Sequence, residues 1–183
     1  LAPVISPHDP YHVDLHKQFL PPSREYLFGT DFYGRDVLSR VIYGSRISLL
    51  IGLIPSFISM FIGTIMGLLS GYYGKWVDTL IMRLVDILLA FPSLLLAMVI
   101  IYTLGASLAN LFIALAVVGW ARAARVVRSQ TLSLKEQDFV QAAKAIGVKD
   151  WTILIRHILP NCLAPLIVLL TMGIPSAIMW KQG

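Results

Sequence analysis

The chain is poor in cysteine and in charge. Among its 183 residues there is one cysteine, Cys162, which excludes an internal disulfide and a cysteine-based metal cluster and leaves a small packing residue. Charged residues make up only 14% and hydrophobic residues 57%, whereas about a quarter of the residues in soluble domains are charged. This balance argues against an ordinary soluble domain and predicts a multi-pass membrane protein.

Several catalytic and transport signatures are also missing. The sequence contains no Walker-A phosphate loop, no HExxH zinc motif and no internal repeat, and Asp86 is the only acid inside an apolar stretch. These absences argue against an ATPase, a membrane metalloenzyme and an ion-coupled secondary transporter. We therefore predict no catalytic residue, no cofactor and no enzyme. The net charge of +5 fits basic loops beside anionic lipid better than binding to nucleic acid.

Four apolar stretches approach the length that a membrane-spanning helix needs, about 20 residues. Their bounds are Ile47–Leu69, Leu84–Leu104, Gly105–Ala121 and Ile158–Trp180. The second and third follow each other directly and predict a hairpin. Glycine and proline inside these stretches are tolerated in membrane helices, and small residues permit close helix contact. The expected fold is an all-α, polytopic membrane helix bundle.

The first part of the chain, 1–46, is predicted to hold the end of a first membrane helix, an extracytoplasmic loop and an interfacial helix. It begins with a short apolar remnant of a helix and continues as an irregular loop. Thr30 and Asp31 are good helix-start residues, and they predict an interfacial amphipathic helix that leads into the first span. A packed loop is the alternative.

The remainder is predicted to be a transmembrane domain, 47–180, with a cytoplasmic loop at 122–157 and an atypical tail at 181–183. The loops assigned to the inner side carry nine cations and the outer side six, a weak positive-inside bias. Three arginines at the end of the third span strengthen this orientation. We expect the chain to be a fragment without its first and last helices.

The stretch between the third and fourth spans is polar and regular. Ser133 and Glu136 have capping-box spacing for a helix over Leu134–Ile146. Gly147 then stands where a left-handed residue ends a helix, and Asp150 is placed to cap a second short helix that begins at Trp151. The resulting elbow either inserts into a groove of a partner protein or lies as a surface helix under the bundle.

The same residues carry a family resemblance. The order QAA, then Gly147, then a leucine-proline pair thirteen residues later resembles the EAA loop of permease subunits of ATP-binding-cassette (ABC) importers. GTDFYGRDVLSRVIYGSRISLLIG, GYYGKWVDTLIMRLVDILLAFPSLLLA and RHILPN resemble the C-type permease of the dipeptide, oligopeptide and nickel branch. The resemblance covers roughly residues 1–179 and implies the type I (MetI-like) permease fold.

This resemblance implies a transport subunit in a bacterial or archaeal plasma membrane. It implies a second permease subunit, two cytoplasmic ATPase subunits that drive the cycle, and an extracytoplasmic binding protein that delivers small peptides, nickel or related solutes. The EAA loop would dock into an ATPase cleft. The residues that map to this ATPase-coupling loop are Gln141, Ala142, Ala143, Lys144, Gly147, Val148, Lys149, Asp150, Trp151 and Pro160.

The chain departs from the family pattern at a few positions. Gln141 replaces the usual glutamate and loses its charge, and His157 replaces an isoleucine of the general pattern, although the peptide branch commonly has histidine there. The ending MWKQG also differs from the acidic stretch and last helix of family members. A non-transporting membrane scaffold is therefore an alternative for this fragment.

Two further groups of residues are candidates for function. His8, His12 and His16 are spaced by four and would share a helix face that binds a transition metal, but prolines near His8 favour solvated loop histidines. Arg83 and Asp86 lie one turn apart at the inner end of the second span. We predict an intramembrane ion pair between them, structural rather than in contact with substrate.

Overall fold

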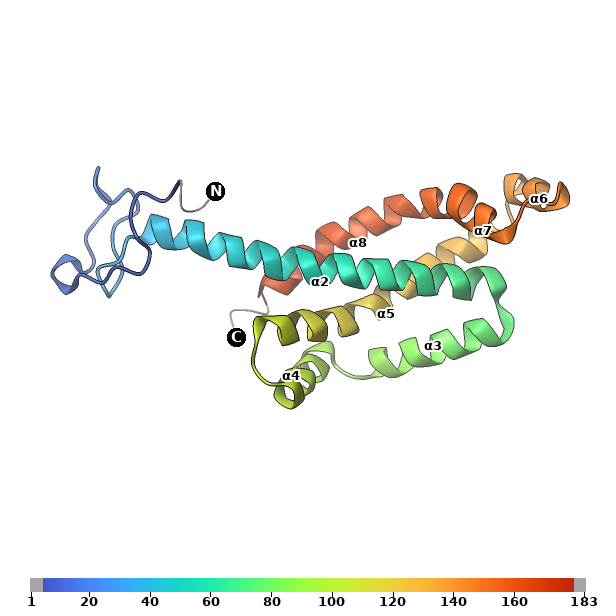
Figure 1. Ribbon diagram of the computed structural model, residues 1–183, viewed down its shortest axis with the longest axis horizontal. Coiled ribbons are helices and arrows are strands. Elements are labelled where there is room, and N and C mark those ends of the chain that lie inside the picture. Colours follow the sequence, from blue (N-terminus) through green and yellow to red (C-terminus); the bar gives the residue numbers. More distant parts are fainter. Residues whose placement is uncertain (1–4, 180–183) are drawn as a thin grey trace. The chain divides into compact units, whose positions relative to one another are not determined.

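The computed structural model describes residues 5–179, and its regular structure is helical (Figure 1). Within that range the only β-type pairing is an isolated bridge between Thr30 and Asp36. The prediction of an all-α bundle is confirmed. Trp180 and the tail at 181–183 lie outside the described residues. The elements are η1 (Leu15–Lys17), α2 (Val37–Tyr73), α3 (Lys75–Ala90), α4 (Ser93–Leu104), α5 (Leu108–Leu134), α6 (Asp138–Ala145), α7 (Asp150–Ile153), η2 (Leu154–Ile158) and α8 (Leu159–Met179).

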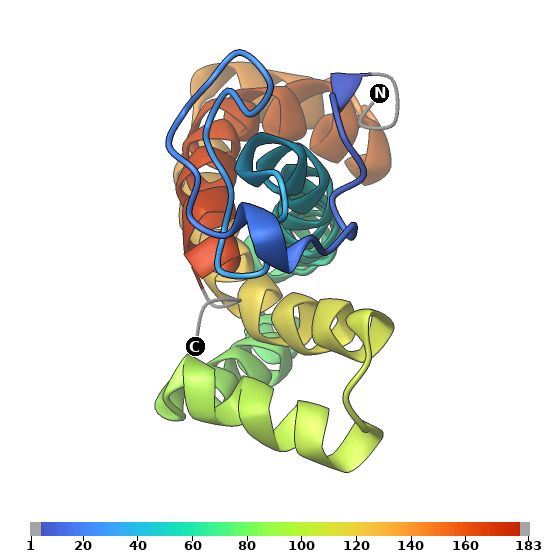
Figure 2. The same ribbon diagram turned by 90° about the vertical axis from the view of Figure 1, so that its left-hand side faces the viewer.

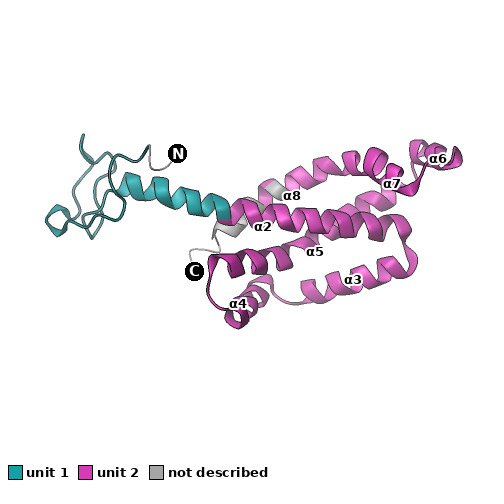
Figure 3. Ribbon diagram, viewed as in Figure 1, with its two compact units in different colours: residues 1–50 teal, residues 51–183 magenta. Residues whose placement is uncertain are grey.

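The chain divides into two compact units, Leu1–Leu50 and Ile51–Gly183 (Figure 3). The helix α2 contributes its first turns to unit 1 and the rest to unit 2. Unit 1 is otherwise mostly irregular, and unit 2 holds the other long helices. Each unit is described by itself below.

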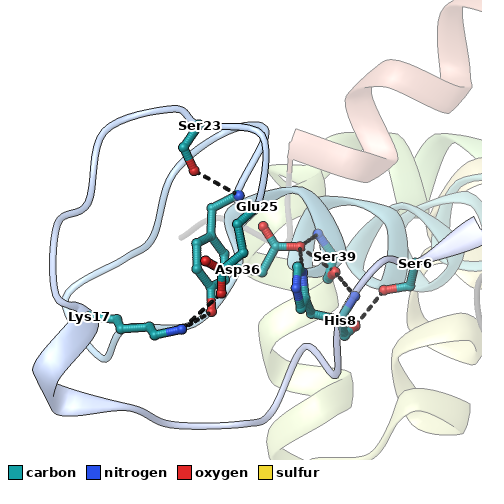
Figure 4. Close-up of polar contacts among 8 residues, drawn as sticks. Ser6, His8, Lys17, Ser23, Glu25, Asp36 and Ser39 are labelled. Carbon is teal, nitrogen blue, oxygen red and sulfur yellow. Dashed lines mark hydrogen bonds and ion pairs between the residues drawn. The ribbon is translucent and has the colours of Figure 1, made fainter.

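In unit 1 the helix does not begin where the sequence suggested. Thr30 and Asp31 lie in the preceding loop, and α2 begins at Val37. The reason is a better cap: the buried Asp36 carboxylate accepts hydrogen bonds from the backbone N–H and the hydroxyl of Ser39, at 3.0 and 2.5 Å (Figure 4). Asp31 instead stabilises the loop, where its carboxylate accepts hydrogen bonds from the backbone N–H groups of Tyr33 and Arg35.

Three helices of the described chain are long and apolar enough to cross a membrane, or up to four if the bent pair α3 and α4 counts as one span. The prediction of a continuous second span over Leu84–Leu104 is wrong, because α3 and α4 meet at an angle of 92°. Pro92 lacks an N–H and disfavours helix at the residue before it, and Phe91 is accordingly extended (φ −90°, ψ 140°).

The third predicted span is longer than its apolar run. The helix α5 begins at Leu108, where the Ser107 side chain accepts from the backbone N–H of Asn110, and it continues to Leu134. Its last turns lie within 122–134, a segment that we had assigned to the cytoplasmic loop. Figures 1 and 2 show α5 at the middle of unit 2, in contact with α3, α4 and α8.

Glycines let α2 and α5 approach closely. Gly63, Gly67 and Gly71 stand one turn apart on α2, and a Cβ built at any of them would lie 2.6 to 2.9 Å from a backbone carbonyl oxygen of α5. No side chain larger than hydrogen fits at that distance. The predicted role of small residues in helix contact is therefore confirmed for Gly63 and Gly67.

The fourth span begins before its prolines. A π-helical turn, Leu154–Ile158, joins α7 to α8 without a break. Pro160 has no N–H for the preceding turn, and a π turn is one way in which a helix accommodates that loss. The side chain of Asn161 donates to the His157 carbonyl at 2.7 Å. Cys162 is fully buried in the core of unit 2, as expected of a packing residue.

Candidate functional site

The polar stretch folds into the predicted helix, glycine elbow and helix. Gly147 adopts φ +77°, a left-handed conformation that glycine adopts at little cost. The N–H of Gly147 donates to the carbonyl of Lys144, and the N–H of Val148 donates to that of Ala143, both at 3.0 Å. These bonds satisfy the free carbonyls at the end of α6. Figure 1 shows α6 and α7 at the end of unit 2 where α5 finishes.

The predicted caps of this elbow are wrong. Ser133 lies in the last turn of α5, and α6 begins only at Asp138 after Gln137, which makes no side-chain cap. Asp150 is the first residue of α7 rather than its cap. The capping-box spacing failed because packing extends α5 to Leu134, so that Ser133, the predicted N-cap, is already helical.

The apolar side chains of this helix and elbow lie in two different environments. Val140 and Ala143 are buried, and they belong to the same core cluster as Ile153 at the start of the last span. Phe139 and Ile146 point away from that cluster and are 45% and 81% exposed. Val140 and Ala143 therefore anchor the elbow, Phe139 lies beside His157 with ring centres 6.4 Å apart, and Ile146 is left exposed for contact with a partner.

We call the outward part of the elbow the elbow tip. Its members share exposure and small or apolar character, and they are Ala142, Ala145, Ile146, Gly147 and Trp151. Ile146 and Trp151 are 81% and 67% exposed, which is high for apolar side chains beside a polar loop. Among the other residues predicted for this site, Gln141, Lys144, Lys149, Asp150 and Pro160 are exposed and Val148 is half-buried.

Gln141 makes a hydrogen bond that the glutamate of the family pattern would not make at this position. Its side-chain N–H donates to the carbonyl of Lys135 at 2.8 Å. The bond ties α6 to the end of α5. A carboxylate has no proton to donate at neutral pH, so the substitution exchanges a charge for a local hydrogen bond.

Tyr72 is part of this site and was missed from the sequence. Its hydroxyl donates to the Asp150 carboxylate at 2.6 Å, and the Lys144 ammonium lies 4.9 Å from the centre of its ring. The residues are 78 positions apart. The only indication in the sequence was the aromatic pair of Tyr72 and Tyr73 just after the first apolar stretch.

The predicted partner of Asp86 is wrong. Its carboxylate accepts from Arg125 of α5 at 2.6 Å instead of pairing with Arg83. Asp86 and Arg83 share a helix, but the contact between α3 and α5 brings a second arginine to the carboxylate. Eight residues earlier, two turns along α3, Asp78 makes a second such bridge to Arg128. Arginines at the end of the third apolar stretch thus hold two helices together.

The histidines of unit 1 do not form a metal centre. Among the described residues there is no group of three or more histidine, cysteine or acidic side chains that would hold a metal ion. His8 stacks on Tyr26 with ring centres 4.9 Å apart, and its Nδ1 lies 3.5 Å from the Asp36 carboxylate. Figure 4 shows the His8 ring beside Asp36 and Ser39.

Two acidic side chains of unit 1, Asp31 and Asp36, are held ionised. Burial alone would raise the pKa of Asp36, but hydrogen bonds from Ser39 outweigh it and lower that pKa. For Asp31, burial again opposes the change, and hydrogen bonds from the side chain and backbone of Arg35 and the backbone of Tyr33 lower the pKa to about 2. The loop is therefore stabilised by charged carboxylates.

The fold and the elbow define a multi-pass membrane protein with a structured polar connection before its last span. A family model described as the binding-protein-dependent transport system inner membrane component matches residues 59–180. The chain belongs to this family, whose members are inner-membrane components of transport systems that depend on a binding protein.

Individual relatives are similar over most of the chain. It is 50% identical over 158 residues to a dipeptide transport system permease protein of Alkalihalophilus pseudofirmus, covering 86% of this chain and 52% of the relative. It is 46% identical over 185 residues to the corresponding protein of Haemophilus influenzae, covering 98% and 63%. It is 43% identical over 157 residues to a glutathione transport system permease protein of Pectobacterium atrosepticum, covering 86% and 52%. The chain spans about half to two thirds of these relatives.

Proposed function

We propose that the chain is the transmembrane part of a permease subunit in an ATP-driven importer of small peptides. An extracytoplasmic binding protein delivers the substrate, a second permease subunit completes the path, and two cytoplasmic ATPase subunits drive the cycle. Family membership and the names of the relatives, which include dipeptide and glutathione permeases, support this proposal.

The elbow tip is the observation that carries the proposal. Ile146 and Trp151 expose large apolar surfaces on a segment whose backbone is fixed by the Gly147 turn. An exposed apolar side chain on a rigid helical elbow can insert into a hydrophobic groove of a partner. Val140 and Ala143 hold the elbow to the bundle core, so a partner that moves the elbow also moves the spans.

The experiment is co-purification of the full-length subunit with its candidate ATPase subunits. Ile146→Ala and Trp151→Ala remove exposed tip side chains, and Trp76→Ala is the matched control, because Trp76 is 72% exposed on α3. We expect both tip variants to lose most of the bound ATPase and the control to keep it. Equal retention by all three would contradict docking at the tip.

A second variant tests the backbone of the elbow. Gly147→Asp places a charge and a Cβ at a left-handed residue, while Gly105→Asp places the same change at another left-handed residue on the α4–α5 turn. Neither glycine has a heavy atom within 4 Å of the built Cβ, so neither change creates a clash, and Gly105 (φ 92°, ψ 154°) lies in a backbone region open essentially to glycine alone, which makes it the more demanding control. We expect loss of the ATPases only for Gly147→Asp.

A further inference from the structure

Tyr72 is the point at which the end of α2 touches both halves of the elbow. Its hydroxyl donates to Asp150 in α7 at 2.6 Å, and its ring lies under the Lys144 ammonium of α6 at 4.9 Å. A hydrogen bond to a carboxylate is stronger than one between neutral groups, and a cation over an aromatic ring adds attraction. One side chain therefore joins α2 to two separate helices.

The chain itself does not connect α2 to the elbow. The elbow continues from α5 on one side, and on the other it runs through η2 into α8 without a break. These two spans must follow the elbow when it moves. In contrast, α2 precedes α3 in the sequence and reaches the elbow only through side-chain contacts.

The end of α2 is otherwise fixed to the bundle. Gly71 brings it against Thr131 and Arg128 of α5, and the Ser70 hydroxyl donates to the Asp78 carboxylate at 2.5 Å. Tyr72 follows directly on these residues and packs against the core cluster that includes the anchoring residues of α6. A displacement of Tyr72 would therefore displace the end of α2, and with it α5, because the two helices are in close contact at the glycines of α2.

We propose that Tyr72 is a positioning residue that makes α2 move together with the elbow when a partner displaces it. The inference rests on the proposed function, because it needs a partner at the elbow tip. The inference adds a residue outside the elbow. It assigns the transmission of movement to the hydrogen bond between Tyr72 and Asp150, which Tyr72→Phe removes while leaving the ring in place.

The test measures the distance between α2 and the elbow in the full-length subunit assembled with its ATPases. Spin labels are attached through Phe61→Cys on α2 and Gln137→Cys before α6, both exposed positions. In the described chain the native Cys162 is fully buried, which protects it from labelling. Distances are recorded without nucleotide and with ATP and vanadate, in the native background and with Tyr72→Phe.

In the native background we expect the mean distance to stay the same in the two conditions, because α2 follows the elbow. With Tyr72→Phe we expect it to shift by about 2 Å or more, the size of helix displacements in switching proteins. Tyr73→Phe is the matched control, since Tyr73 is the exposed neighbour of Tyr72, and we expect it to behave as the native protein. The inference is overturned if Tyr72→Phe gives the same distances as the native protein and Tyr73→Phe. It is also overturned if the distance in the native protein already changes when ATP and vanadate are added.

Two further measurements separate the possible failures. Asp150→Ala should produce the same shift as Tyr72→Phe, and the double variant should shift no more than either, because both remove one bond. A double variant that shifts by the sum of the two contradicts the shared bond. Co-purification is measured on the same samples. If the native subunit does not retain the ATPases, the proposed function fails; if every variant retains them and the distances agree, only the role of Tyr72 fails.

Discussion

Arg128 grips the carboxylate of Asp78 with two hydrogen bonds, from Nε to Oδ1 at 2.5 Å and from Nη2 to Oδ2 at 2.6 Å. This two-pronged geometry joins α5 to α3 across the turn that follows α2. The hydroxyl of Ser70 on α2 donates to the same carboxylate, so one acidic group holds three helices. Neither side chain is more than a third exposed.

Asp78→Ala should destabilise the protein more than an ordinary surface change. The variant leaves Arg128 without its acceptor and Ser70 without its partner, and loss of hydrogen bonds to a charged group costs about 2 kcal/mol. Thr79→Ala is the neighbouring control, because Thr79 is exposed and bonds only its own helix. Unfolding in detergent by a chemical denaturant measures the difference, and equal midpoints for the two variants would contradict the role of the bridge.

Gly67→Ala should weaken the contact between α2 and α5. The added Cβ would lie 2.6 Å from the carbonyl oxygen of Ala124, a backbone atom that cannot move aside cheaply. Overpacking of this kind typically costs about 1–3 kcal/mol.

Gly44→Ala is the control for this change, because a Cβ at Gly44 meets nothing within 4 Å and alanine is the better helix former by about 1 kcal/mol. Thermal unfolding of the purified protein should place the Gly67 variant below the native protein and the Gly44 variant at or above it. The reverse order would show that the two helices separate easily at this point.

The sequence was sufficient for features that depend on neighbouring residues. Apolar length predicted the first, third and fourth spans, and the small residues within them predicted close packing. The position of Gly147 predicted the elbow, since a left-handed residue after a short helix is a local requirement. These features need no information about which helices meet.

Other features depend on contacts between distant segments. Asp86 has an arginine three residues away and another 39 residues away, and only the packing of α3 on α5 decides between them. The bend at Pro92 was hidden because apolar residues continue on both sides of it. The contact of Tyr72 with Asp150 has no counterpart in any periodicity. Long-range pairs of this kind follow from helix packing, which the order of residues leaves open.

Gln141→Glu should loosen the connection between α5 and α6 even though it restores the charge usual in the family that the sequence resembles. The variant loses the bond to the Lys135 carbonyl and brings a carboxylate toward that oxygen, at a cost of about 1 kcal/mol. Hydrogen exchange of the amides over 135–141 should become faster. Gln137→Glu is the matched control: Gln137 makes no side-chain cap, and a carboxylate at this helix start interacts favourably with the helix dipole, so the exchange should not become faster.

The loop of unit 1 should lose structure in acid through Asp31. Its carboxylate accepts from the side chain and backbone N–H groups of Arg35 and from the guanidinium of Arg40. Burial opposes the change, but the bonds from Arg35 and from the backbone N–H of Tyr33 lower its pKa from 3.8 to about 2. A carboxyl group whose pKa falls on folding stabilises the folded state above its unfolded pKa, and that contribution disappears as the pH falls through the folded pKa.

The window for this loss is therefore between pH 3.8 and about 2. Hydrogen exchange over residues 14–40, corrected for the intrinsic effect of pH, should rise in that window for the native protein. Asp31→Asn should already exchange rapidly at pH 5, because the neutral amide cannot hold both arginines and its N–H₂ faces other donors. Asp9→Asn is the control, since Asp9 is an exposed loop carboxylate that accepts from Tyr11 alone. If the native and Asp31→Asn proteins exchange alike at pH 5, the loop is held by its backbone bonds and the carboxylate contributes nothing to its stability.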